Sequence, residues 1–366
     1  MTAGASAAST STPRTDGAGC EAIDEVLAHH RRLTRRRVAI TLALGLLAVA
    51  AFIVDLFSGP SGLSMADALT ALVSPGSMDP TTLAIVQNIR LPAALTAVLV
   101  GAGLAVAGAE LQTVFDNPLA EGLTLGIAPA AAFGAALAIV LGISVPGVPA
   151  ALIVPINAFV VAFGATLALL AMARAAGGGA QTLLLIGIGL VFTFNALIAL
   201  LQFVASQQAL QQLVFWMLGS LSGARWPAIG PLALAVVVLV PLAVARSWQL
   251  TALRLGEERA QSLGIDLRRL RLMSLIRVSL LTAAAVSVVG TIGFVGLIGP
   301  HIARILVGED HRFFLPASAL IGALVMSLAA AGSKLLLVGV VVPIGILTAL
   351  TGLPVFFALI LTGRAR

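Results

Sequence analysis

The sequence predicts an all-α membrane protein with about ten transmembrane helices and both termini in the cytoplasm. Of its 366 residues, 59% are hydrophobic and only 10% are charged, which is too apolar for a soluble domain of this length. Apolar runs of about 20 residues, the length that crosses the hydrocarbon core of a bilayer, recur along the chain. On the resulting map, 18 of the 21 Lys and Arg residues fall on one side, which the positive-inside rule identifies as the cytoplasm.

Residues 1–37 are predicted to be a disordered basic tail in front of a transmembrane domain that covers residues 38–366. The tail runs from a Ser-, Thr-, Ala- and Gly-rich stretch into a basic one that ends at Arg37, and this cluster places the N-terminus in the cytoplasm. Cys20 is the only cysteine, so an internal disulfide or a cysteine-based metal cluster is excluded. The stretch before Cys20 lacks the apolar core of a signal peptide.

Ten apolar segments are predicted to cross the membrane. The eighth is short enough to be a broken or partly re-entrant helix, and small residues at helical spacing, such as Gly101 and Ala105, allow helix backbones to approach closely. Only Arg90, Arg225 and Lys334 fall on the outer side of this map. The ten segments are 38–58, 91–113, 122–142, 150–172, 182–204, 227–247, 272–290, 292–307, 315–333 and 342–361.

The long cytoplasmic connection between the sixth and seventh segments is predicted to contain a short helix. Glu257 and Glu258 lie in its first turn, where the helix dipole favours acids, and Gly264 is placed to end it with a left-handed cap. Ala260 and Leu263 lie three residues apart, so they are expected to form a small apolar knob on one face. A helix on this loop is a natural contact for a soluble partner, and a solvated loop helix without a partner is the alternative.

Five stretches, in the same order along the chain, resemble FecCD-type permeases, the membrane subunits of binding-protein-dependent ABC importers for iron-siderophore complexes, haem and vitamin B12. One is the loop helix just described, which resembles the family's coupling segment. Each string alone is a weak signal, but collinear matches over about residues 85–361 are specific. The five stretches are Arg90–Pro92, Gly108–Ala120 with its Asp-Asn-Pro-Leu-Ala ending, Leu255–Gly264, Gly290–Arg304 and Pro343–Pro354.

The resemblance implies a type II ABC importer permease in the cell membrane. Such a subunit pairs with a second permease, identical or paralogous, with two ABC ATPase subunits inside and a substrate-binding protein outside. The sequence contains no GxxxxGK[ST] P-loop, so we expect no enzyme activity and no cofactor or metal on this chain, and ATP-Mg on the partner subunits. The residues implied to contact the ATPase are Gly256, Glu257, Glu258, Arg259, Ala260, Leu263 and Gly264.

At the outer face, the resemblance assigns Arg90 and Lys334 to receive acidic side chains of the binding protein. Charge pairs of this kind mostly speed and orient docking, and ordinary interfacial anchoring is the alternative role. The sequence departs from the family at Ala93, where a second arginine is usual, and at Val341, where an acid is usual before the last span. The docking face is therefore expected to be partly altered.

By the same resemblance, the fifth and tenth spans line the translocation path at the dimer interface. Their sparse hydroxyl and amide groups suit a large ligand carried without tight coordination, so direct iron coordination is not expected. Glu110 in the second span either snorkels to the cytoplasmic interface or is a pore-lining or gate acid. The other candidate path and gate residues are Ala180, Gln181, Thr193, Asn195, Thr348 and Thr351.

The sequence thus predicts inward movement of an iron-siderophore complex or related metal chelate, with haem or cobalamin as the alternative cargo. An ion-coupled secondary transporter needs intramembrane acids, and only Asp55 and Glu110 qualify, both near predicted span ends. An intramembrane enzyme needs a constellation such as a serine with a base, and His301 is the only candidate base near Ser327 and Ser333. The basic residues lie beside apolar runs, so nucleic-acid binding is not expected.

Overall fold

The computed structural model describes residues 16–60, 63–74, 76, 78–144, 146–177, 179–337 and 339–361, and over these residues the chain is almost entirely helical. Within these described residues, seven helices are long and apolar enough to cross a membrane, and three further apolar helices are shorter. Each falls within or overlaps one of the ten predicted segments. They are α1 (Asp16–Phe57), α4 (Leu91–Val114), α5 (Ile127–Leu141), α6 (Ala150–Ala175), α7 (Ala180–Val204), α9 (Trp226–Ala245), α12 (Leu267–Val289), α13 (Val295–Val307), α14 (His311–Leu335) and α15 (Ile344–Leu361).

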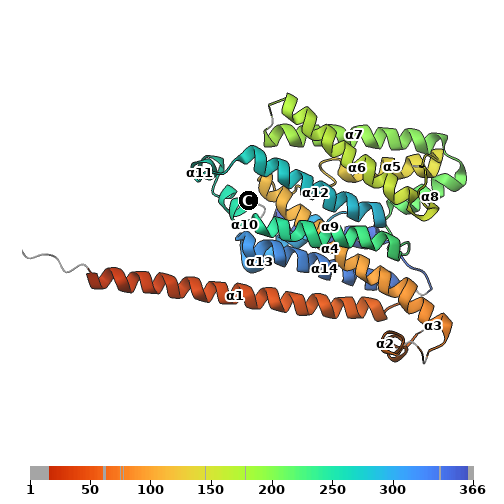
Figure 1. Cartoon of the computed structure of the whole chain (residues 1–366), viewed down its shortest axis with the longest axis horizontal. Helices are drawn as coiled ribbons and strands as arrows, with labels where there is room; N and C mark the ends of the chain where they lie inside the picture. The colour runs from red at the N-terminus through yellow and green to blue at the C-terminus, as the bar shows by residue number, and fades with distance from the viewer. Residues whose placement is uncertain are drawn as a thin grey trace, which may run out of the picture.

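Helix α1 differs from the predicted tail. Residues 1–15 lie outside the described residues, but from Asp16 onward the chain is helical, so α1 includes most of the segment predicted to be disordered. Residues 16–37 contain no proline and are rich in Ala, Glu, Leu and Arg, which favour helix even without a packing partner. Figure 1 shows α1 along one side of the bundle, with its N-terminal part extending beyond the other helices.

Two of the short apolar helices begin or end inside the bundle. Helix α5 has 15 residues and α13 has 13, which correspond to about 20 Å of rise each, less than the hydrocarbon thickness of about 30 Å. The short length of α13, the eighth predicted segment, agrees with the prediction, whereas α5, the third predicted segment, begins later than predicted. The first residues of that segment, from Gly122 to Gly126, form turns, and Gly126 adopts a positive φ of 77°.

Short helices close the two ends of the bundle. The end that carries Arg90 and Lys334, here called the outer end, has α2 (Met65–Val73), α3 (Pro80–Ile85), the π-helical turn η2 (Val86–Arg90) and α8 (Gln207–Met217). The opposite, inner end has α10 (Ser247–Leu253) and α11 (Glu257–Ser262), and the charge distribution places it in the cytoplasm. Figure 1 shows α2, α3 and α8 on the right and α10 and α11 on the left.

Helix α4 is the centre of the bundle and packs against α14, α12, α13 and α9. Two glycines set its closest contacts, because a Cβ on Gly101 would collide with the backbone of Gly322 in α14, and one on Gly108 with Gly296 in α13. Glycine is therefore required at these crossings for the backbones to touch. The three helices form one tightly packed block.

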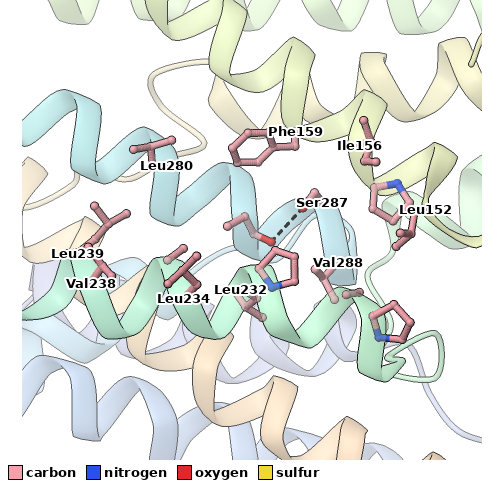
Figure 2. A pocket seen from close by; sticks show the side chains of 16 residues that line it. Leu152, Ile156, Phe159, Leu232, Leu234, Val238, Leu239, Leu280, Ser287 and Val288 are labelled. Atoms are coloured by element: carbon pink, nitrogen blue, oxygen red, sulfur yellow. Dashed lines mark hydrogen bonds between the residues drawn. The ribbon is translucent and has the colours of Figure 1, made fainter. Parts of the chain in front are cut away.

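At the outer end, α6 and α9 flank α12 and leave an apolar groove of about 500 Å³ between them. Figure 2 shows Leu152, Ile156 and Phe159 of α6 on one side and side chains of α9, including Leu234 and Val238, on the other. Ser287 also lines the groove, and its hydroxyl donates to the Ala284 carbonyl of its own helix at 3.0 Å. The groove is therefore suited to contact with lipid tails.

Candidate coupling site and translocation path

Helix α11 lies at the inner end where the sequence predicts a coupling helix. It has six residues and is bounded by Gly256 (φ 103°) and Gly264 (φ 81°), conformations that a residue with a side chain rarely adopts. The predicted apolar knob is not formed, because Ala260 is fully buried and Leu263 is 51% exposed. Leu263 already lies beyond the helical turn, so the two side chains diverge, and the exposed apolar surface is made by Leu263 with Leu255 instead.

The charged residues of α11 face different surroundings. Glu257 forms an ion pair with Arg271 of α12, which holds the start of α11 against the bundle. Glu258 and Arg259 are exposed. Of the seven predicted coupling residues, all except Ala260 are therefore accessible to a partner at the inner end.

A cluster of charges fixes the segment that carries α11. Arg254, at the end of α10, donates from Nε and Nη2 to the two carboxylate oxygens of Glu309, at 3.1 and 2.7 Å, and from Nη1 to Asp116. A second bridge joins the same elements, since the His311 ring lies 2.8 Å from the Thr113 hydroxyl and 3.2 Å from that of Thr251. The segment that carries α11 is thus attached to α4 and to the start of α14.

These attachment residues were not identified from the sequence. Asp116 lies in a stretch that resembles the family and Arg254 directly precedes another, but they are 138 positions apart, so no local spacing indicates that they pair. Glu309 is 55 positions beyond Arg254. The only signal available was an acid beside the Asn-Pro turn and an arginine just before the coupling segment.

Glu110 is neither exposed nor directed toward water. It is 1% exposed, and its two oxygens accept from Nε and Nη2 of Arg277 in α12 at 3.0 and 2.9 Å. Arg277 Nη2 also donates to the Ser274 hydroxyl at 3.0 Å. The carboxylate therefore forms a buried, bidentate ion pair between α4 and α12, and it does not snorkel, because its partner lies inside the bundle.

Arg90 and Lys334 both hold the outer end of α1. Lys334 Nζ donates to the backbone oxygen and to Oδ1 of Asp55, at 2.9 and 2.7 Å, and Asp55 is completely buried. Arg90 is 4% exposed and donates to the Phe57 carbonyl at 3.1 Å. Both cations line a cavity of about 340 Å³ at the outer end, together with Val341 and serines that precede α9. Their charges are thus recessed beneath the outer surface.

The predicted path residues lie mostly on open faces of α7 and α15. Thr193 and Thr351 are exposed, and each hydroxyl donates to a carbonyl of its own helix at 2.8 Å. Thr348 is fully buried, so it contacts the interior of the bundle instead. Helix α7 is the least buried of the seven long spans, which leaves its face free for a partner or a ligand. The other members are Asn195 and Gln181, both exposed, and Ala180, which is half-buried.

A further acid, Glu121, lies between the inner end and this path. It is 8% exposed and belongs to the connection between α4 and α5. Its carboxylate accepts a hydrogen bond from the backbone N–H of Phe294, the residue that caps α13, while burial raises the pKa of Glu121 to about 7. The Phe294 side chain in turn lies directly against Gly352 of α15. No local pattern in the sequence indicates these contacts, because Glu121, Phe294 and Gly352 are far apart along the chain.

Comparison with known proteins supports one family for most of the chain. The model of the FecCD transport family matches residues 46–362. The hemin transport permease HmuU of Yersinia pestis is 37% identical over 279 residues, which are 76% of this chain and 84% of HmuU. The vitamin B12 permease BtuC of Salmonella typhi is 35% identical over 92% of this chain and 99% of BtuC. The molybdate permease MolB of Haemophilus influenzae is 35% identical over 88% of this chain and 95% of MolB.

A solved structure has the same architecture. "An inward-facing conformation of a putative metal-chelate type ABC transporter" superposes with a TM-score of 0.78 at 33% identity. The match covers 88% of this chain and 99% of that one. The helical arrangement described above is therefore that of a known class of importer permease.

Proposed function

Since the chain belongs to the FecCD transport family, and is thus a multi-pass membrane permease of an ABC importer, we propose that it carries an iron-siderophore complex or related metal chelate into the cytoplasm. Two separate ATPase subunits supply the energy, and a second permease subunit completes the path. The observation that carries this proposal is α11, an exposed short helix on a segment fixed to the bundle by Arg254.

The mechanism follows from that attachment. When the ATPase subunits bind and hydrolyse ATP, they displace α11, and the Arg254 contacts with Glu309 and Asp116 pass the movement to α14 and α4. The two permease subunits then alternate between outward-open and inward-open states. Bidentate pairing suits this role, because an arginine held by two carboxylates resists both translation and rotation.

The exposed faces of α7 and α15 support a path at the interface between two permease subunits. Their polar groups are few, and the two exposed threonine hydroxyls are already bonded to their own helices. Such a surface can pass a bulky chelate without binding it tightly, so selectivity rests on the substrate-binding protein. Relatives whose names specify hemin and vitamin B12, and a structural neighbour described as metal-chelate type, favour a large chelate as cargo.

At the outer end, we assign Arg90 and Lys334 to docking of the substrate-binding protein. Both line the same cavity, which is wide enough to admit an acidic side chain. The substrate-binding protein would then insert an acidic side chain into this cavity, instead of contacting a charge that protrudes from the surface. The hydrogen bonds of both residues to the end of α1 would position the two cations for that contact.

The test is ATP-dependent uptake in proteoliposomes that contain the permease with its cognate ATPase and binding protein. Labelled ferric siderophore should accumulate with ATP, and should not accumulate when the ATPase carries an inactive P-loop. Uptake that persists without ATPase but disappears when an ion gradient is collapsed would instead indicate a secondary transporter.

The same vesicles distinguish the cargo. Ferric siderophore, haem, cobalamin and molybdate are offered separately, each with the same ATPase and binding protein. Transport of haem or cobalamin alone would select the alternative cargo and leave the importer mechanism intact. Transport of molybdate alone would exclude a large chelate.

A further inference from the structure

Four arginines surround a cavity of about 490 Å³ at the inner end of the bundle. Arg174 comes from the end of α6, and Arg268, Arg269 and Arg271 come from the start of α12. Figure 1 shows these helix ends, with the start of α7, on the same side of the molecule as α11. Positive charge is therefore concentrated where these three helices leave the membrane.

The deeper wall of this cavity is apolar. It is formed by Leu170, Leu183, Leu272 and Leu275. Leu170 lies about one helical turn before Arg174 on α6, and Leu272 and Leu275 lie about one and two turns beyond Arg268 on α12. The cavity thus has a cationic rim at the level of the cytoplasmic interface and an aliphatic interior on the membrane side. An ion alone would use only the rim, and an apolar molecule only the interior.

The rim has more positive charge than its neighbours neutralise. Glu257 pairs with Arg271, but the guanidinium groups of Arg174, Arg268 and Arg269 form no ion pair with any residue that the structure describes. Arg271 itself retains a buried Nε–H without an acceptor among those residues. Nearby Asp266 is occupied as the cap of α12, where its carboxylate accepts from the Arg269 backbone N–H.

We propose that this cavity binds an anionic phospholipid of the cytoplasmic leaflet, with its headgroup phosphate against the arginines and the upper part of an acyl chain against the leucines. Anionic lipids are the one abundant ligand at this depth that combines both chemistries, and basic pockets between spanning helices on the cytoplasmic side suit their headgroups. The arginines offer planar, bidentate donors that match a phosphate. The site adjoins α11 through Arg271, so a bound lipid would stabilise the ion pair that holds the start of α11 against the bundle.

The proposal is tested by native mass spectrometry of the full chain in mild detergent, titrated with phosphatidylglycerol or phosphatidylcholine. Phosphatidylglycerol should bind more tightly, with one lipid per chain bound first. Arg174→Gln and Arg268→Gln should each weaken that first binding step about fivefold, since a basic residue near an anionic lipid contributes on the order of 1 kcal/mol. Phosphatidylcholine binding should be unchanged.

Arg246→Gln is the matched control, because Arg246 is exposed at the same interface but lies outside this cavity. If Arg246→Gln weakens phosphatidylglycerol binding as much as Arg174→Gln and Arg268→Gln do, the lipid is attracted by the overall positive charge of this interface, and the proposal of a specific site is wrong. Arg268→Lys should restore part of the preference. Circular dichroism confirms that each variant remains folded.

Two further outcomes would also overturn the proposal. Displacement of phosphatidylglycerol by inorganic phosphate at equal concentration would show an anion site that does not use the leucines. Loss of ATPase association in Arg174→Gln, with lipid binding unchanged, would assign the cavity to the ATPase interface. The lipid measurement needs neither cargo nor ATP, so its failure leaves the importer function untouched.

Discussion

Lys334 lies where a docking residue was expected, yet its ammonium group is already bonded to Asp55. Lys334→Glu should slow uptake and weaken binding of the substrate-binding protein about fivefold, the scale of a single charge pair near a surface. The affinity can be measured by titrating the reconstituted permease with labelled binding protein.

Asp55→Asn is the control for this prediction, because it removes the ion pair with α1 and keeps the lysine charge. If anchoring α1 is the only role of Lys334, both variants will weaken binding equally. A loss confined to Lys334→Glu supports docking.

The Glu110–Arg277 pair is a case in which two single residues determine the stability of the bundle. Arg277→Met would leave a buried carboxylate without its partner, and the cost of breaking such a pair is about 3–5 kcal/mol. We expect a large drop in the apparent unfolding temperature in detergent. Replacing both residues, as Glu110→Leu with Arg277→Met, should recover most of it, since neither charge is then buried. Failure of the double variant to recover would show that the pair is required for more than charge balance.

Glu121 makes a pH-dependent contribution of unusual sign. Its pKa is raised from 4.5 to about 7, so the folded chain holds this proton more tightly than the unfolded chain does. Its contribution to stability is therefore greatest below pH 4.5, falls as the pH rises and is lost above about pH 7. Glu121→Gln keeps an acceptor for Phe294 and should flatten this part of the profile, by up to about 3 kcal/mol between pH 5 and 8. The measurement is thermal unfolding of both proteins at the two pH values. If Glu121 ionises as freely as in the unfolded chain, wild type and Glu121→Gln will show the same change in stability between them.

At the scale of elements, Leu255 and Leu263, which flank α11, offer exposed apolar surface to a partner beside the exposed charges of Glu258 and Arg259. Leu263→Asp should weaken association with the ATPase and uncouple hydrolysis from transport without unfolding, because Leu263 is 51% exposed. The readouts are co-purification of the ATPase and uptake per ATP hydrolysed. Ser262→Asp adds the same charge one position earlier and keeps both leucines, so it should have a smaller effect. Equal effects in the two variants would indicate that charge alone matters.

The ten apolar helices could be predicted from the sequence because lipid requires long uninterrupted apolar runs, and this signal is local. Helices α2 and α8 were missed, since they are short and lie outside the spans, where hydropathy gives no information. The coupling helix was predicted from its acids and glycines, but the inward direction of Ala260 depends on how α11 packs, which no local spacing specifies. The partners of Glu110 and Arg254 are also set by packing between distant helices.

At the scale of the whole molecule, the packing of α4 leaves no space for larger residues at its glycines. Gly108→Val should prevent correct folding, because a side chain there would overlap the Gly296 backbone. Expression and monodispersity in detergent report the loss. Gly164→Val in α6 is the control, since a Cβ at Gly164 meets nothing within 4 Å. Tolerance of both substitutions would show that α4 and α13 do not touch.

That same contact has a consequence for the transport cycle. Helices whose backbones touch at glycines have no clearance to slide or rotate against each other, so α4, α13 and α14 can only travel together. A displacement of the inner ends of these three helices therefore also displaces their outer ends. We therefore expect the contacts that change during transport to lie at the edge of the bundle, at the largely exposed helices α7 and α15.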